Sequence, residues 1–326
     1  MNTAFLREDN FAEEILRIRR ELDRNKVCGT FARKPGEKIW FELYPATQAR
    51  GWLAISHGFT ESTVKYTELI WYFVNEGWSV AICDHRGHGK SYRQVQPTWL
   101  THVDRFQDYV EDYACFLTHV VEPRREGLPL AVLGHSMGGA IALHLAERHP
   151  ELPVSKWVLC APMIAPATGN NSRAFAGAAS QVMCLLGQGK KCNFAQKPYD
   201  GADDFGEPWC CSTSRARHHW YLELIRAHEE YQNCAASYSW LREAIFQTRS
   251  ALDEKRLSRV KEPLLLLQAG QDTMVDNSLQ DRLVERLPQA RKLVFPDAKH
   301  EIFRCSDAEV ERFVAAVLGF LNEAEY

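Results

Sequence analysis

Short runs of apolar residues recur along the chain, and each run ends in residues that favour turns. Several runs are apolar at successive positions, which is typical of strands that are covered on both faces. Segments with helical periodicity lie between them, so the pattern predicts an α/β fold with a mostly parallel sheet. The expected strands are residues 52–56, 78–83, 130–133, 156–160, 264–267 and 292–295, and the expected helices are residues 66–75, 106–121, 140–148, 278–286 and 309–321.

Two further apolar runs, residues 30–32 and 39–43, precede this alternation and predict an antiparallel hairpin at one edge of the sheet. Earlier still, the apolar residues of segment 11–22 fall on one side of a helix. We interpret this helix as packed against the body of the domain. The alternative is a helix that lies on a membrane surface.

The alternation of strand and helix stops between residues 162 and 248. This segment is rich in Trp, Tyr, His, Arg and Cys, and strand patterning resumes only at Pro263. Because α/β proteins carry their sites in loops at the carboxyl ends of the strands, we interpret residues 162–248 as a helical cap over one end of the sheet. Residues 1–161 and 249–326 would then form the α/β core.

One turn in the pattern is chemically distinctive. Residues 134–138, Gly-His-Ser-Met-Gly, fit the motif G-x-S-x-G and stand between a predicted strand and a predicted helix, which is the context that this motif requires. The turn is tight, so glycines on either side avoid clashes and the Ser136 hydroxyl is held out at the head of the sheet. A serine at a helix start can also be a simple cap, but the context favours a nucleophile.

A serine hydroxyl is a weak nucleophile and needs a base that is oriented by a third group. In the fold of this motif, the acid follows a late strand and the histidine follows the last one. Asp272 and His300 stand at these two places. Asp276 lies one helical turn after Asp272 and is an alternative acid, whereas Asp297 is interpreted as shaping the turn before His300.

Negative charge on the substrate oxygen requires hydrogen-bond donors that are already aimed at it. The backbone N–H of Met137, the residue after the serine, is one expected donor. The loop at residues 56–61 is expected to supply the second, because Gly58 lets the backbone turn closely and leaves the Phe59 N–H free to point at the substrate. The alternative is that His57 and Gly58 only form a turn.

A second glycine-rich segment, residues 84–91, lacks the spacing of a phosphate-binding loop, so we interpret Asp84 and Arg86 as internal polar ties. The adjacent Cys210 and Cys211 have no CxxC pattern and no matching set of His and Cys nearby, and we interpret them as buried or incidental thiols. No dinucleotide fingerprint is visible either. We therefore expect no cofactor and no metal.

Composition narrows the class of protein. The 326 residues are 45% hydrophobic and 25% charged, which suits one large domain with an insertion. The formal net charge of −3 gives no basic surplus for nucleic acid. The first residues lack a secretory signal pattern, and no apolar run approaches the roughly 20 residues that span a bilayer. We expect a cytoplasmic protein, at most peripheral on the inner membrane.

Five blocks of sequence resemble a known family when taken together. They are SHGFTES (56–62), DHRGHGKS (84–91), GHSMGGAIA (134–142), LLLLQAGQDTMVDN (264–277) and KHEIF (299–303), and they are similar to α/β-hydrolases of the monoglyceride lipase and bacterial lysophospholipase group. The last two blocks, with VKYTEL (64–69) and YSWLREAI (238–245), look most like the proteobacterial type of lysophospholipase. The resemblance places the family's nucleophile on Ser136, its acid on Asp272, its base on His300 and its oxyanion donors on Phe59 and Met137.

The resemblance implies hydrolysis of the ester of a single-chain lipid, either a lysophospholipid or, alternatively, a monoacylglycerol or simple ester. Met183 and Leu186 belong to an apolar stripe that could line an acyl channel or could dock the cap. Arg215, Arg217 and His218 could meet a phosphate head group or could form a solvated face. A binding protein without catalysis is an alternative of a different class, and the complete set of catalytic residues argues against it. The oligomeric state stays open.

Overall fold

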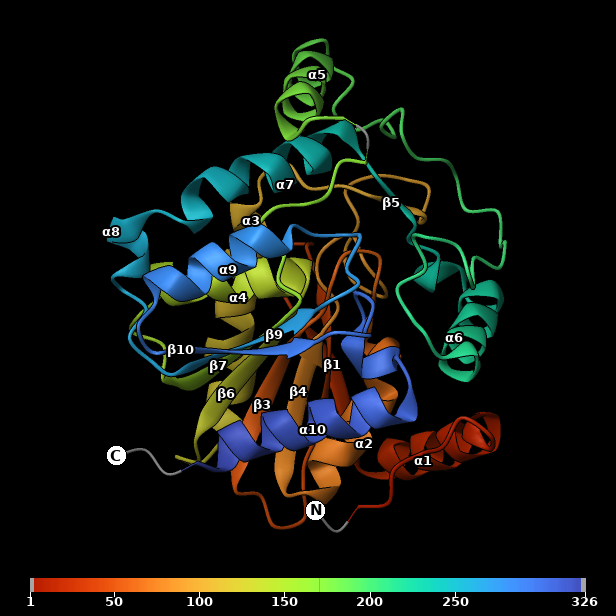
Figure 1. Ribbon diagram of the computed structural model, residues 1–326, viewed down its shortest axis with the longest axis vertical. Coiled ribbons are helices and arrows are strands. Elements are labelled where there is room, and N and C mark those ends of the chain that lie inside the picture. The colour runs from red at the N-terminus through yellow and green to blue at the C-terminus, as the bar shows by residue number, and fades with distance from the viewer. Residues whose placement is uncertain (1–2, 170, 324–326) are drawn as a thin grey trace.

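The computed structural model describes residues 3–169 and 171–323, and an eight-stranded sheet lies at its centre (Figure 1). In spatial order the strands are β1 (Val27–Phe31), β2 (Ile39–Tyr44), β4 (Trp78–Cys83), β3 (Gly51–Ser56), β6 (Leu130–His135), β7 (Val154–Cys160), β9 (Leu264–Ala269) and β10 (Ala290–Phe295). Strands β4 to β10 in this order pair in parallel, whereas β2 pairs antiparallel with both β1 and β4. The predicted parallel sheet and its edge hairpin are confirmed. A separate short ladder joins β5 (Leu100–Thr101) to β8 (Ala235–Ala236).

Helices cover both faces of the sheet, and further helices lie in the segment 162–248. They are α1 (Phe11–Asn25), α2 (Thr67–Asn75), α3 (Gln107–Phe116), α4 (Met137–Arg148), α5 (Arg173–Leu185), α6 (Arg215–Ala227), α7 (Tyr238–Ala251), α8 (Glu254–Leu257), α9 (Asn277–Arg286) and α10 (Asp307–Asn322). Short 3₁₀ or π turns lie at Thr63–Tyr66, Leu117–Val121, Glu122–Arg124, Glu229–Tyr231 and Ile302–Arg304. Figure 1 shows α3, α4 and α9 above the sheet and α2 and α10 below it, with α1 beside α2. Within the described ranges, no helix combines the length and the apolar character that crossing a bilayer requires.

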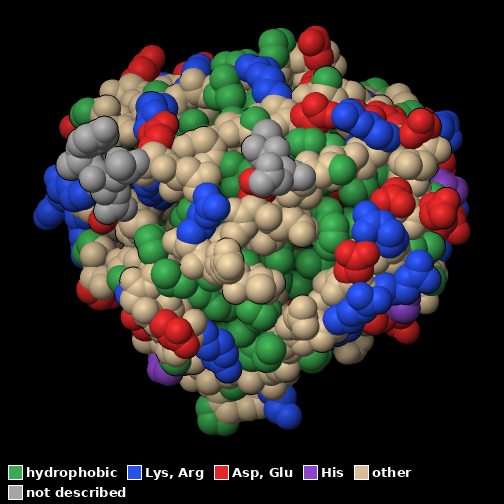
Figure 2. Space-filling view, turned by 90° about the horizontal axis from the view of Figure 1, so that it is seen from below, with side chains coloured by type: hydrophobic (Ala, Val, Ile, Leu, Met, Phe, Trp, Pro, Cys, Tyr) green, Lys and Arg blue, Asp and Glu red, His purple; other side chains and the backbone are tan. Residues whose placement is uncertain are grey.

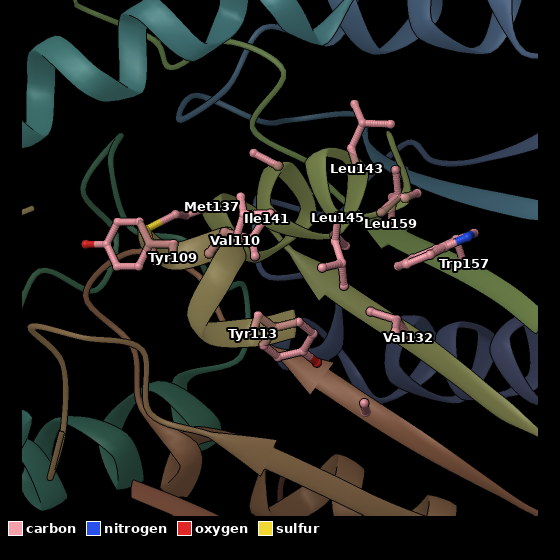
Figure 3. Packing of buried hydrophobic residues seen from close by; sticks show 14 of the residues in the cluster. Tyr109, Val110, Tyr113, Val132, Met137, Ile141, Leu143, Leu145, Trp157 and Leu159 are labelled. Atoms are coloured by element: carbon pink, nitrogen blue, oxygen red, sulfur yellow. The ribbon is translucent and has the colours of Figure 1, made fainter. Parts of the chain in front are cut away.

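Two hydrophobic cores, one on each face, explain why the strands are apolar at successive positions. On β3, Trp52 and Ala54 belong to the core under α3, α4 and α9, whereas Leu53 and Ile55 belong to the core under α1, α2 and α10. Figure 3 shows the first of these cores, where side chains of α3 and α4 pack onto β6 and β7. The apolar side of α1 is buried in the second core, as predicted for a helix that packs on the domain.

The segment 162–248 contains α5, α6, β8 and most of α7, and none of its described residues belongs to the large sheet. In Figure 1, α5 and α7 lie at the top of the molecule and α6 lies to the right, connected to α5 by a long loop. Helix α7 continues past residue 248 to Ala251. The division into a core and a cap stays a prediction. The predicted end of the cap, residue 248, lies inside α7.

The surface away from the cap has mixed charge. Figure 2 shows the molecule from below, the side on which α10 and α2 lie, with acidic and basic side chains interspersed around the edge and hydrophobic side chains between them. This mixture on the visible face agrees with the small net charge of −3.

Candidate active site

The turn between β6 and α4 holds Ser136 in a strained backbone conformation. Its φ and ψ angles are 52° and −117°, and a positive φ is uncommon for a residue with a side chain. The flanking glycines permit the turn, because a Cβ on Gly138 would lie 1.9 Å from the carbonyl oxygen of Ser56. A Cβ on Gly134 would lie 2.5 Å from the carbonyl oxygen of Gly138. The strand, turn and helix that the sequence predicts around Ser136 are therefore present.

Asp272 and His300 lie side by side after β9 and β10. Oδ2 of Asp272 is 2.7 Å from Nδ1 of His300, and both side chains are buried. The second oxygen of Asp272 accepts the backbone N–H groups of Met274 at 2.8 Å and Val275 at 3.1 Å, which fixes the carboxylate. The structure thus brings together the two residues that were predicted from their places after late strands.

The electrostatics of this pair favour a base that is held by an ionised acid. Burial alone would lower the pKa of His300, but the charge of Asp272 and its hydrogen bond outweigh burial, so the pKa is raised above its ordinary value. Burial would raise the pKa of Asp272, but the charge and hydrogen bond of His300 and two backbone N–H groups lower it overall. An ionised Asp272 orients the ring, and the raised pKa makes His300 a stronger base.

His135, the residue before Ser136, connects the serine turn to the histidine loop. The ring centroids of His135 and His300 are 4.8 Å apart, and Nε2 of His135 is 3.3 Å from the carbonyl oxygen of His300. Among the described residues, no hydrogen bond joins the Ser136 hydroxyl to His300, and such contacts are often long before a substrate binds. A serine, a histidine and a carboxylate nevertheless share one end of the sheet, which is the set that nucleophilic acyl transfer needs.

The loop after β3, which carries Phe59, is fixed by a buried carboxylate. Oε2 of Glu61 accepts the Gly58 N–H at 2.7 Å and the Tyr66 hydroxyl at 2.6 Å. Oε1 of Glu61 lies 2.9 Å from Nζ of Lys65. The loop that contains the predicted second oxyanion donor is therefore held from within rather than exposed as a free turn.

Side-chain packing also fixes the two residues whose N–H groups are the predicted donors. The Met137 side chain is fully buried and lies beside Tyr109 and Ile141 in Figure 3. The Phe59 ring packs against Trp240 of α7 with a centroid distance of 4.0 Å. These contacts hold the two side chains in place, and the role of the two N–H groups as oxyanion donors stays a prediction.

Sequence reasoning missed a buried charge network that borders the site. Lys65 contacts both Glu61 and Glu301, the residue after His300. Glu301 pairs with Arg304 at 2.5 Å, and although burial would raise the pKa of Glu301, Lys65 and Arg304 lower it to about 2. The i, i+4 spacing of Glu61 and Lys65 was an available signal, but the link to Glu301 spans 236 positions and no local pattern shows it.

The two other aspartates near the site have different partners. Asp276 caps α9 by accepting the Ser278 N–H at 3.0 Å, and it pairs with Arg173 at 2.7 Å. Asp297 is exposed on the turn before His300. Asp272 is thus the aspartate that contacts His300, and the alternative of Asp276 as the acid has no contact in its favour.

The glycine-rich segment after β4 is a set of internal ties, as predicted. The Asp84 carboxylate accepts the N–H groups of Thr63 at 2.7 Å and Lys90 at 2.9 Å. Arg86 is buried and pairs with Asp112 at 2.6 Å.

The position of Arg217 corrects the expectation that it meets a substrate head group. Its side chain is only 1% exposed and pairs with Glu68 at 2.8 Å and Asp307 at 2.7 Å. The guanidinium also lies over the Phe11 ring at 5.0 Å. Arg217 therefore connects α6 to α1, α2 and α10. Its positive charge is paired with carboxylates inside the protein and does not face a substrate.

The other cap residues predicted as substrate contacts lie apart from this ion pair. Arg215 is exposed and lies over the Phe205 ring at 4.7 Å. Nε2 of His218 is 2.9 Å from Asp203. Met183 is half-buried on α5, and Leu186, just after that helix, is 67% exposed. Among the described interactions, none links these four predicted residues to Ser136, Asp272 or His300.

Comparisons with known proteins agree with this architecture. A family model described as serine aminopeptidase, S33, matches residues 47–307. Lysophospholipase L2 of Escherichia coli (strain K12) is 31% identical over 291 residues, which cover 83% of this chain and 80% of the relative. Monoacylglycerol lipase of Mycolicibacterium smegmatis is 32% identical over 136 residues, which cover 41% of this chain and 46% of the relative.

Among solved structures, a soluble variant of monoglyceride lipase from Saccharomyces cerevisiae superimposes with a TM-score of 0.71 at 17% identity, covering 90% of this chain and 94% of that one. The fold is that of the α/β hydrolases, which confirms the predicted fold class. The chain belongs to the serine aminopeptidase S33 family of these enzymes. The predicted enzyme class, a carboxylic ester hydrolase, is also confirmed.

Proposed function

We propose that this protein cleaves the carboxylic ester of a lipid with one acyl chain, a lysophospholipid in the first place, through an acyl-enzyme on Ser136. The observation that carries the proposal is the buried pair of Asp272 and His300, 2.7 Å apart, at the same end of the sheet as the strained Ser136 turn. The likeness to a lysophospholipase over 83% of the chain supports the choice of substrate.

The proposed reaction has two steps. His300 takes the proton of Ser136 as the hydroxyl oxygen attacks the ester carbonyl, and Asp272 stabilises the imidazolium that forms. The N–H groups of Phe59 and Met137 donate to the oxyanion. The alcohol leaves with the proton from His300, and water then attacks the acyl-enzyme by the same route to release the fatty acid.

A monoacylglycerol is the second candidate substrate. The matched part of the Mycolicibacterium smegmatis monoacylglycerol lipase covers 41% of this chain, against 83% for the lysophospholipase, so the longer likeness favours a lysophospholipid. Of the cap cations predicted to meet a phosphate, Arg215 is the one that remains exposed, and we assign it the head-group contact. A phosphate favours arginine as its partner.

Peripheral contact with a lipid surface belongs to the same proposal. Helix α5 and the residues after it expose large apolar side chains, with exposed fractions of 55% at Phe175, 53% at Val182, 76% at Leu185 and 67% at Leu186. The opposite side of α5 packs on α7, because Ala176 and Gly177 are buried there. Met183 and Leu186 would therefore meet acyl chains at the membrane, and the protein would take its substrate from that surface.

The test compares fatty-acid release by the purified protein from lysophosphatidylethanolamine and from monoolein, with Ser136→Ala as the blank. Faster release from the phospholipid, measured as kcat/KM, is the expected result. Faster release from monoolein would make the protein a monoacylglycerol lipase and Arg215 a surface charge. Ester hydrolysis by Ser136→Ala at the rate of the unaltered protein would refute the acyl-enzyme itself.

A further inference from the structure

A cluster of metal-ligating side chains lies in the cap, outside the candidate active site. Asp204, Cys210 and His218 each offer one ligand atom, and these three atoms lie within 4.8 Å of one another. The residues come from α6 and from the long segment that runs down the right side of Figure 1 between α5 and α6. We propose that Asp204, Cys210 and His218 form a binding site for a zinc-like divalent transition-metal ion. This inference goes beyond the proposed ester hydrolysis and does not rest on it.

The types of ligand select the class of ion. Calcium and magnesium are bound by oxygen atoms, whereas a cysteine sulfur and a histidine nitrogen in one set favour zinc and similar transition metals. Zinc is bound by cysteine sulfur, histidine nitrogen and aspartate or glutamate oxygen, and in sites with three protein ligands water takes the fourth position. The set of Asp204, Cys210 and His218 fits this pattern.

The distance between sulfur and nitrogen fits a shared ion. Sγ of Cys210 is 3.7 Å from Nδ1 of His218. Bond lengths of about 2.3 Å to sulfur and about 2.0 Å to nitrogen at a tetrahedral ion put these two atoms about 3.5 Å apart. The observed separation is therefore within about 0.2 Å of the one that a shared ion requires.

The other nitrogen of His218 has the partner that such a ligand needs. Nε2 lies 2.9 Å from Oδ1 of Asp203, and a carboxylate at this place orients a metal-ligating imidazole and raises its basicity. Oδ1 of Asp204 is 3.5 Å from the same nitrogen, and its side chain is 42% exposed. Asp204 is thus the ligand with freedom to turn, and it would complete the set by closing on the bound ion.

The Cys210 sulfur is buried, whereas the Asp204 side of the cluster is open to solvent. Cys210 is 2% exposed and the His218 side chain 12%, and the Phe205 ring lies 5.3 Å from the His218 ring. The more open side is that of Asp204. An ion could therefore enter past the carboxylate and reach a sulfur and a nitrogen that are largely protected from water.

The adjacent Cys211 has a different role, which separates the two neighbouring thiols. Its sulfur lies 3.5 Å from the carbonyl oxygen of Trp209, and its own carbonyl oxygen accepts the Glu301 N–H at 3.0 Å. The ligand positions 204, 210 and 218 do not form a CxxC pattern. The expectation of no metal was based on the absence of that pattern, so it did not test for this site.

An ion here would act on a segment that borders the candidate active site. The carbonyl oxygen of Glu207 accepts from Nζ of Lys299 at 3.4 Å, and that of Pro208 accepts from the Thr273 hydroxyl at 3.1 Å. Residues 207–211 therefore contact both loops that carry Asp272 and His300. Metal binding would fasten this segment to α6 and hold the wall beside those loops in place.

The test uses the full chain, freed of metal with a chelator and kept reduced, and titrates it with Co²⁺ and then with Zn²⁺. We expect one equivalent of Co²⁺ to produce a near-ultraviolet thiolate-to-cobalt absorption band that Zn²⁺ removes. Cys210→Ser should lose this band. His218→Gln should weaken binding by at least about tenfold, since losing even a residue that only supports a ligand costs about 10-fold to 100-fold in metal affinity.

Matched variants control for the other thiols and histidines. Cys211→Ser and His219→Gln change the neighbouring residue of the same type and should bind like the unaltered protein. Zn²⁺ should also raise the Tm of the unaltered protein and of Cys211→Ser, but not that of Cys210→Ser. No stoichiometric Co²⁺ band, or an equal band in a folded Cys210→Ser, would overturn the proposal.

Discussion

The end of the sheet that carries Ser136 and the cap beside it are held together in different ways. In the core, each of Ser136, Asp272 and His300 follows a parallel strand, so the strand ends determine where these side chains lie. In the cap, the position of α6 depends on ion pairs such as Arg217 with Glu68, which are 149 positions apart. The strand ends of the main chain determine where the candidate catalytic residues lie, whereas side-chain ion pairs determine where α6 of the cap lies.

The largest effect that would test this comparison is expected from Asp272→Asn. The substitution removes the charge that orients His300, and the loss of kcat should be about 10³-fold to 10⁴-fold, the scale seen when the acid of such a triad is replaced. Asp276→Asn is the matched control, because Asp276 pairs with Arg173 and not with His300. It should keep most of its activity, and an equal loss in both variants would contradict the assignment of the acid role to Asp272.

The pH profile gives an independent measurement of the same pair. Hydrolysis needs neutral His300, so kcat/KM should rise as pH increases through the pKa of His300. That pKa lies above the ordinary 6.5 because Asp272 outweighs burial. In Asp272→Asn, burial is no longer opposed by this charge, so the residual activity should rise at lower pH than in the unaltered protein. An unchanged profile would contradict the electrostatic coupling of the two groups.

A smaller effect, on stability, is expected when the central ion pair of the cap is broken. Arg217→Met keeps much of the side-chain volume but leaves the buried Glu68 without its charged partner. Removing one member of a buried ion pair costs about 3–5 kcal/mol, which urea unfolding measures as a fall in the free energy of unfolding. Arg215→Met, two residues earlier and exposed, should change that free energy by less than about 0.5 kcal/mol.

The outcome for these two arginines decides between the structural role and the substrate role. If Arg217→Met unfolds like the unaltered protein, and its KM for a lysophospholipid rises, the side chain faces the substrate and not Glu68. If only Arg215→Met raises that KM, the head-group contact belongs to Arg215. The comparison between core and cap predicts the second result.

The same difference explains what could be predicted from the sequence. Apolar runs covered on both faces identify the parallel strands, and G-x-S-x-G between a strand and a helix identifies the serine turn, because both are local patterns. Asp272 and His300 follow from their places after late strands. The inward position of Arg217 could not be read in this way, since a helical face with Arg and His is typical of either a solvated surface or an anion site, and only the fold brings Glu68 beside it.

The smallest expected effect concerns α5 and would show whether the cap surface meets lipid. Replacing Leu185 and Leu186 by Glu removes two exposed apolar side chains, and burying each in a membrane contributes about 1.5 kcal/mol or more, so binding to anionic phospholipid vesicles should fall by at least about tenfold. Val27→Glu, at a position that is 48% exposed on the edge strand β1, is the matched control and should bind vesicles like the unaltered protein. Hydrolysis of a short soluble ester should be unchanged in both variants. Equal sedimentation of all three proteins with vesicles would assign the apolar side of α5 to some contact other than a membrane.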